Sequence, residues 1–523
     1  SLEDVQDWFK TYYGPNNAVL ALAGDNELET AKAKVTKFFG DIPAGPPLIK
    51  PERWIAKRLE EKREVMFDNV PQARIYKIWN VPERDTEAAA HFDLASSILV
   101  GGKNSPLYKE LVYEKQIATN VSSFYYDREI AGMFFITADV VAGVDPAIVE
   151  QSMDEVMEAF IKKGPSTKLL KAEKTKAIAG FIRGIQRIGG FGGKSDLLAT
   201  CQTYTGNPGC YQESAKYLDA ATSSKIKATF AEWIDDTPYV LTILPSDQYG
   251  LSDESVDRST GVPYPTEKVS FKFPTLQTAT LSNGAKVVLA QRSDVPLVEM
   301  NFQFNFGYAQ ENNDELGFTN FMMDMLNEGT RKYSSLEFDQ ILDSLGSNIG
   351  FGSGLDSSFV SISSLKDNLD ETLDLAKEAV MYPTFPLDEI ERIKKQTLAA
   401  FKREEFRPAS IAFRNIGNLL YGQDHPYGKL LIGSGVSETI RSLTQSDLSS
   451  IHKRTLNPKN LTFVVAGDIS LDEITQTLEK KFGSWNADMS SPLKDLSNVE
   501  LPDTRIVYLI DKPNAQQSYI VAG

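Results

Sequence analysis

The pattern of apolar and polar positions at the start of the chain predicts two helices with a strand between them. Apolar residues at helical spacing indicate an amphipathic helix over residues 2–12, which Pro15 ends. Residues 18–23 form a continuous apolar run bounded by turn residues, which is typical of a buried strand. Helical spacing returns over residues 27–39.

Helix and strand patterns then alternate in blocks. Helical spacing is found over residues 88–100, 106–113, 146–163, 168–187 and 196–204. Strand composition is found over residues 65–79, 121–126, 133–140 and 238–245. Because strands and helices come in blocks, we expect an α+β fold in which helices pack on a sheet.

A polar segment with three prolines, residues 252–274, lacks periodicity and is interpreted as a linker between two halves. After it, Asn283-Gly284 stands between two alternating runs, which predicts a β-hairpin. A strand is expected over residues 300–306, and helices over 317–326 and 335–345.

The chain contains a long internal repeat. Residues 12–25 are similar to residues 455–468, and Ala23-Gly24-Asp25 aligns with Ala466-Gly467-Asp468. The offset is a constant 443 residues, and it still holds at Tyr76, which aligns with Tyr519. A gapless match of this length indicates that a multi-domain half was duplicated, so residues 1–80 and 444–523 are expected to superimpose.

Charge and composition narrow the partners. The 523 residues include 55 Lys and Arg and 71 Asp and Glu, giving a formal net charge of −16 that disfavours nucleic acid. No apolar run approaches the roughly 18 residues of a membrane span. The two cysteines, Cys201 and Cys210, flank a turn-rich spacer that is compatible with a disulfide or with two free thiols.

Several motifs together resemble the pitrilysin/insulinase family of zinc metallopeptidases, M16. They are Tyr13–Asp25 followed by Phe39–Pro43, Leu107–Leu111, Leu281–Gly284 followed by Gly317–Thr330, and Tyr382–Phe385. The resemblance covers essentially the whole chain. It implies repeated LuxS/MPP-like α+β domains with mixed antiparallel sheets packed with helices, in duplicated halves that close over a peptide.

The resemblance also implies a domain organisation. Residues 1–250 would be the second domain of the first half, and residues 251–274 the linker. Residues 275–440 would be a degenerate third domain, and residues 441–523 the start of a truncated fourth domain. A helix cap at Ser1 and a strand-like end suggest a piece of a longer protein, whose first domain would precede Ser1.

Zinc in this family is bound by His-x-x-Glu-His on a helix of the first domain, where the Glu activates water. None of the three histidines, His91, His425 and His452, has a His partner at helical spacing. The family's oxyanion-stabilising Arg and Tyr would lie beyond Gly523.

The equivalent helix of the second half is degenerate. By its flanking glycines, Asn320 and Asp324 stand at the two His positions and Met323 at the Glu position. The more distant Glu position falls near Thr397 or Leu398. We therefore expect no catalytic, metal-binding or cofactor-binding residue in this chain, and zinc only in a longer parent.

The resemblance implies a zinc endopeptidase parent, a peptide or unfolded polypeptide as substrate, and a periplasmic or exported location. A non-catalytic M16-like scaffold is the alternative, and a homo-oligomer is possible.

Gly189–Ser195 ends like a P-loop, but Ile188 replaces the required glycine and the preceding segment has helical spacing.

Overall fold

The computed structural model describes residues 1–68, 70–234, 237–245, 275–422, 425–429, 431–486, 506–513 and 517–523. The chain divides into two compact units. The first comprises Ser1–Val65 and Arg74–Thr242, and the second comprises Met66–Ala73 and Ile243–Gly523. The expected linker, residues 251–274, lies outside the described residues.

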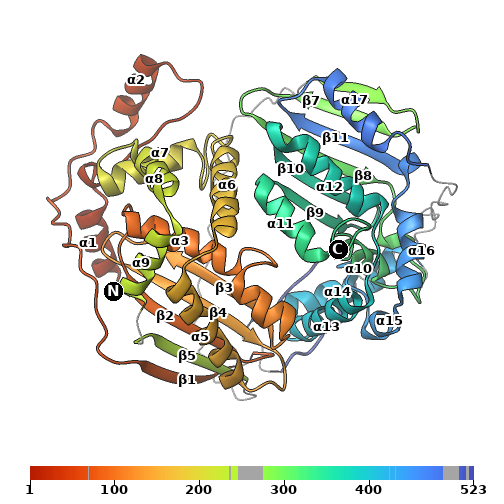
Figure 1. The fold of residues 1–523 in the computed structure, drawn as a ribbon. Coiled ribbons are helices and arrows are strands. Elements are labelled where there is room, and N and C mark those ends of the chain that lie inside the picture. The colour runs from red at the N-terminus through yellow and green to blue at the C-terminus, as the bar shows by residue number, and fades with distance from the viewer. Residues whose placement is uncertain are drawn as a thin grey trace. The chain divides into compact units, whose positions relative to one another are not determined.

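A five-stranded sheet is the centre of the first unit (Figure 1). Its strands lie in the order β1-β5-β2-β4-β3. They are β1 (Lys62–Asp68), β2 (Arg74–Val81), β3 (Ala118–Tyr126), β4 (Gly132–Val140) and β5 (Tyr239–Pro245). β4 pairs antiparallel with both β2 and β3. Alternate residues of β2 and β4 are buried, as expected for strands with one face on a core.

Helices cover this sheet. They are α3 (Glu87–Val100), α4 (Pro106–Tyr108), which continues as a π-helix (Lys109–Glu114), α5 (Pro146–Lys163), α6 (Thr167–Gly184), α7 (Lys194–Thr205), α8 (Cys210–Ala220) and α9 (Ser223–Trp233). α3 contacts β3, α5 contacts β2 and β4, and α9 contacts β2. Phe92, Phe134 and Phe230 are fully buried and lie with ring centroids 4.9–5.4 Å apart. This aromatic cluster joins helices to sheet.

Residues 1–43 form helices α1 (Leu2–Tyr12) and α2 (Leu28–Phe39) and a short 3₁₀ turn, Pro15–Asn17. Both helices were predicted. The prediction of a buried strand over residues 18–23 is wrong for this structure, since the segment is extended but unpaired. Neither helix contains a buried residue.

A six-stranded sheet is the centre of the second unit, in the order β6-β7-β11-β8-β10-β9. Its strands are β6 (Gln277–Thr280), β7 (Lys286–Gln291), β8 (Leu297–Phe304), β9 (Asn348–Ser353), β10 (Ser358–Leu365) and β11 (Leu461–Gly467). The β6–β7 hairpin turns at the predicted Asn283-Gly284. β11 is inserted parallel to β7 and antiparallel to β8, so residues on both sides of the expected boundary at 440/441 share one sheet.

The helices of the second unit are α10 (Phe318–Asp324), α11 (Ser335–Leu345), α12 (Leu369–Met381), α13 (Leu387–Glu404), α14 (Pro408–Tyr421), α15 (Ser437–Ser442), α16 (Gln445–Thr455) and α17 (Leu471–Phe482). Helix α11 contacts β9, α12 contacts β10, and α17 contacts β6 and β7 (Figure 1). Phe302, Phe463 and Phe482 are fully buried and cluster between α17 and the sheet. The predicted α+β class, with mixed sheets packed with helices, is confirmed.

Candidate functional site: helix α10

Helix α10 carries the positions at which the resemblance would place metal ligands. Its N-cap is Gly317, which has a left-handed φ of 93° and no capping side chain of its own. The cap comes from Glu311, whose carboxylate oxygens accept hydrogen bonds from the backbone N–H groups of Gly317 (2.9 Å) and Thr319 (2.6 Å). The start of the helix is therefore held by a buried acid that precedes it in the chain.

The environment of Glu311 shifts its ionisation. Desolvation raises the pKa of Glu311 to about 7, although the two backbone hydrogen bonds favour the charged form. Lys429 also favours the charged form, and its ammonium donates to the backbone carbonyl of Glu311. Desolvation is the larger effect, so the cap of α10 titrates near neutral pH.

A glycine-containing loop lies against the same helix. Gly433 and Gly435 both have left-handed φ values, 63° and 83°. A Cβ at Gly433 would overlap Asn320, and one at Gly435 would overlap Leu316, so glycine is required at both positions. The Asn320 side-chain amide donates to the carbonyl of Gly433 at 2.9 Å. Asn320 is thus part of the loop's anchoring.

The other two motif positions differ in surroundings. Met323 is fully buried in the core of the second unit, where a water-activating Glu would have no access to solvent. Asp324 reaches solvent, although protein atoms surround most of its carboxylate. Desolvation, and then the charge of Glu328, raises the pKa of Asp324 to about 6. Asp324 alone has the chemistry of a metal ligand.

The expected distant position offers no ligand. Thr397 lies on α13 and donates its hydroxyl to the carbonyl of Ile393 at 3.0 Å, and Leu398 packs against the core. Among the described residues, no group of three or more His, Cys, Asp and Glu side chains is arranged to hold a metal ion. The donor set around α10 does not fit a zinc site.

Next to α10, the structure reveals an ion-pair cluster that the sequence patterns did not indicate. Arg392 of α13 donates to Glu328 and to Glu389, both at 2.6 Å, and Glu328 also accepts from the Ser335 hydroxyl at 2.7 Å. All four residues are buried. The four residues come from three separate segments, so their positions give no periodic signal in the sequence. The missing capping side chain at Gly317 was the one available sign that an acid from elsewhere completes α10.

The three histidines are dispersed. His91 Nδ1 lies 2.7 Å from the Thr229 hydroxyl, and His452 Nε2 lies 2.8 Å from the carbonyl of Val380. Burial lowers the pKa of both imidazoles. His425 Nδ1 accepts from the Tyr427 amide at 3.0 Å. Each histidine has a local structural contact instead of a His partner.

The P-loop-like segment also has a local role. Helix α6 precedes it, as the sequence suggested, and α7 begins at Lys194 directly after Gly193. The carboxylate of Asp196 accepts from the Gly192 amide at 2.8 Å. The strand that a P-loop requires before its glycines is replaced by a helix.

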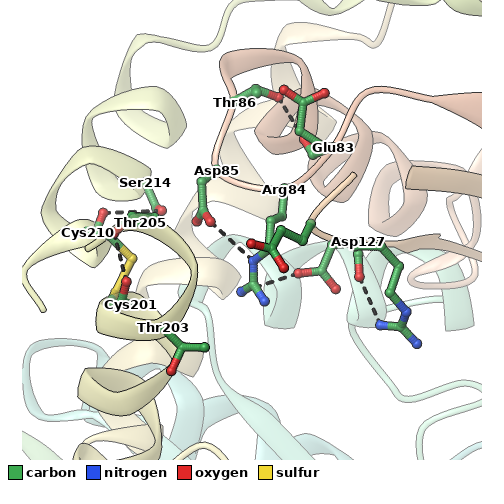
Figure 2. Close-up of polar contacts among 12 residues, drawn as sticks. Glu83, Arg84, Asp85, Thr86, Asp127, Cys201, Thr203, Thr205, Cys210 and Ser214 are labelled. Atoms are coloured by element: carbon green, nitrogen blue, oxygen red, sulfur yellow. Dashed lines mark hydrogen bonds and ion pairs between the residues drawn. A yellow bond between two sulfur atoms is a disulfide. The ribbon is translucent and has the colours of Figure 1, made fainter. Parts of the chain in front are cut away.

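A second polar cluster, in the first unit, surrounds Arg84 (Figure 2). The guanidinium lies 3.2 Å from the carboxylate of Asp85 and 3.4 Å from that of Asp127, and 4.3 Å from the ring centre of Tyr204. Tyr204 lies on α7, which a disulfide from Cys201 to Cys210 joins to α8. Of the two states that the cysteine spacing allowed, the structure has the disulfide.

Comparison with known proteins identifies the family. The model for the peptidase M16 inactive domain matches residues 1–177 and 442–523, and the model for insulinase (peptidase family M16) matches residues 286–433. The chain belongs to peptidase family M16.

The individual relatives are distant. An uncharacterized zinc protease of Rickettsia felis is 24% identical over 204 residues, 39% of this chain and 49% of the relative. In Helicobacter pylori, the zinc protease PqqE is 24% identical over 44% of this chain and 50% of its own length, and the non-peptidase homolog YmxG is 24% identical over 39% and 48%. The chain spans about half the length of these curated relatives.

Two solved structures are also similar. The peptidase M16 inactive domain from Pseudomonas fluorescens is 27% identical, with a TM-score of 0.39, over 42% of this chain and 53% of that one. The periplasmic protease PqqL from Escherichia coli is 13% identical, with a TM-score of 0.38, over 92% of this chain and 57% of that one.

Proposed function

We propose that this chain is a non-catalytic part of a zinc-dependent M16 endopeptidase. It contributes walls of a peptide chamber and a degenerate copy of the zinc helix, and the zinc site lies outside residues 1–523. Membership of family M16 and the zinc protease relatives support the peptidase assignment. The donor set around α10 supports the non-catalytic role.

One observation carries the non-catalytic assignment. The position that should supply the water-activating carboxylate is Met323, and its side chain is fully buried. A metal-bound water needs a solvent-connected site with three protein ligands. Neither a thioether in the core nor the Asn320 amide that is bonded to Gly433 meets that need.

Peptide binding does not depend on those ligands. In the described sheet of the second unit, β9 lies at one edge and contacts α10. An edge strand can add an extended peptide through its unpaired backbone groups. We propose that an unfolded peptide binds along β9 as an additional strand of this sheet.

The second candidate is a scaffold whose complete protein also lacks catalysis. The relative that is named a non-peptidase homolog supports this alternative. It matches 39% of this chain, the same share as the Rickettsia felis zinc protease. A native protein that binds a peptide but does not cleave it would favour the scaffold.

We further propose an exported location, in an oxidising compartment such as the periplasm. Disulfides such as Cys201–Cys210 persist in oxidising compartments and are rare in reducing ones. Among the described residues, no helix combines the length and the apolar character required to cross a bilayer.

The test uses a quenched fluorescent peptide assay, with and without a chelator. It compares the 1–523 chain with the native protein, meaning the longer polypeptide of which we propose this chain to be a part. We expect the chain to bind the peptide without turnover, and the native protein to cleave it until the chelator is added. Metal analysis of the dialysed chain should find no stoichiometric zinc. Zinc that is bound one-to-one and lost in Asp324→Asn would overturn the non-catalytic assignment.

A further inference from the structure

The segment of residues 1–43 has a counterpart in residues 444–486, 443 residues later. The structured elements of the two copies match residue by residue. Helix α1 aligns with α16, the turn Pro15–Asn17 with Pro458–Asn460, and α2 with α17, each with identical bounds at that offset. Both copies also begin with the same capping box, at Ser1 and at Thr444. The two copies therefore have the same local structure.

The environments of the two copies differ. In the second copy, β11 is inserted between β7 and β8, and the apolar residues of α16 and α17 are buried on this unit. In the first copy, residues 18–23 pair with no strand. Trp8, Leu20 and Phe39 are 53%, 55% and 53% exposed, whereas their counterparts Ile451, Phe463 and Phe482 are at most 1% exposed. The same apolar positions are a core in one copy and a surface in the other.

The backbone of the first copy is already shaped for a neighbouring strand. Gly24 and Gly467 have nearly the same φ, 143° and 149°. At Gly467 glycine is needed, because a Cβ would overlap the carbonyl of Leu297 on β8. At Gly24 the nearest atoms to a Cβ would be side-chain atoms of Asn26 and Ile188, at 3.4 and 3.9 Å. The close approach that requires glycine is present in the second copy and missing in the first.

We propose that residues 1–43 are a docking segment for a further insulinase-type domain that residues 1–523 do not contain. Residues 18–24 would be inserted as a central strand of that domain's sheet, parallel to one strand and antiparallel to the next, as β11 is. α1 and α2 would then bury their apolar faces on the same domain. Because the corresponding domain directly precedes residues 444–486 in the second copy, the partner is expected to precede Ser1 in the same polypeptide.

This arrangement satisfies two physical demands at once. Leucines and aromatic residues on one face of α1, α2 and the segment between them would leave water, as their counterparts do. The unpaired backbone of residues 18–23 would gain a ladder on both sides. The inference concerns assembly and is independent of catalysis.

The test is amide hydrogen exchange on the 1–523 chain and on the native protein. In the 1–523 chain, amides of residues 18–24 should exchange freely while those of residues 461–467 are protected. In the native protein, residues 18–24 should exchange at least about 100-fold more slowly. Unprotected residues 18–24 in the native protein would overturn the proposal.

Two matched variants locate the interface. Leu22 aligns with Val465, which is 1% exposed, and Ala21 aligns with Val464, which is 45% exposed. Leu22→Lys should therefore abolish the protection in the native protein, and Ala21→Lys should leave it. In the 1–523 chain, neither variant should change the melting temperature. Protection of residues 18–24 in that chain that rises with its concentration would show that a second copy is the occupant, which contradicts the proposal.

Discussion

Buried glutamates near α10 are stabilised in two different ways. Glu311 accepts hydrogen bonds from the backbone N–H groups of Gly317 and Thr319. Glu328 forms an ion pair with the guanidinium of Arg392. Desolvation by burial raises the pKa of Glu311, although its two backbone hydrogen bonds and the charge of Lys429 favour the ionised form. A carboxylate that forms an ion pair with a buried cation is destabilised when that cation is removed.

Glu311 should make the stability of the second unit fall as pH rises. Its pKa is about 7 in the folded chain and about 4.5 when unfolded, so the folded state binds the extra proton between these values. The stabilisation is complete below pH 4.5 and is lost as pH rises through 7, by up to about 3 kcal/mol. Denaturation midpoints across this range should fall with rising pH less steeply in Glu311→Gln than in the chain, because below pH 6 both proteins keep the contribution of Asp324, whose pKa is raised to about 6.

Glu337 offers a control of opposite sign. Hydrogen bonds from the backbone and hydroxyl of Ser334 lower the pKa of Glu337, so its contribution is lost as pH falls below the ordinary Glu range. Glu337→Gln should leave the slope between pH 4.5 and 7 in place. An unchanged slope in Glu311→Gln would contradict the assignment.

Removal of Arg392 should strongly destabilise the second unit. Arg392→Met removes a buried cation that pairs with both Glu328 and Glu389, and losing one partner of a buried pair costs about 3–5 kcal/mol. Lys402→Met, at an exposed position on the same helix α13, should stay within about 0.5 kcal/mol. Urea denaturation compares the three proteins, and equal midpoints for the two variants would refute the role of the cluster.

Among the elements, α7 and α8 depend on a covalent link. The disulfide joins residues only nine positions apart, and it holds α7, which carries Tyr204 over Arg84. Burial in these helices is modest, since Cys201 is the one buried residue that either contains. The disulfide therefore provides order that a small core cannot.

Loss of the disulfide should loosen α7 and α8 while the sheet of the first unit stays folded. For a loop of this length, chain entropy predicts a cost of about 2–3 kcal/mol. In the Cys201→Ala/Cys210→Ala variant, hydrogen exchange should accelerate in residues 194–220 and stay slow in β2 and β4. A reductant should accelerate exchange in the same residues of the unmutated 1–523 chain, and it should have no effect on the variant. Acceleration throughout the first unit would contradict a local role.

At the scale of the whole molecule, much of the fold was predictable because it follows local patterns. The spacing of apolar residues placed the helices Pro146–Lys163 and Ser335–Leu345 at their observed bounds, and Asn283-Gly284 placed the hairpin. The expected strand over residues 18–23 fails in this structure because a central strand needs neighbours, which local sequence cannot supply. The same reasoning explains why β11 joins a sheet from across the expected boundary at 440/441.

The candidate site was predictable only in its residue types. Asn320, Met323 and Asp324 were predicted to be a poor ligand set from their positions alone. The burial of Met323, the bond from Asn320 to Gly433 and the raised pKa of Asp324 depend on segments that are distant in sequence.

The position of β11 has a consequence for folding. Its pairing of Leu461 with Phe304 closes a very long loop, and such non-local contacts slow folding. During synthesis, β7 and β8 must wait with open edges until β11 has been made, and open edges invite pairing between chains. A chain that ends at Ile440 should therefore aggregate during refolding, whereas one that ends at Asn486 should not, and light scattering at equal concentrations measures the difference.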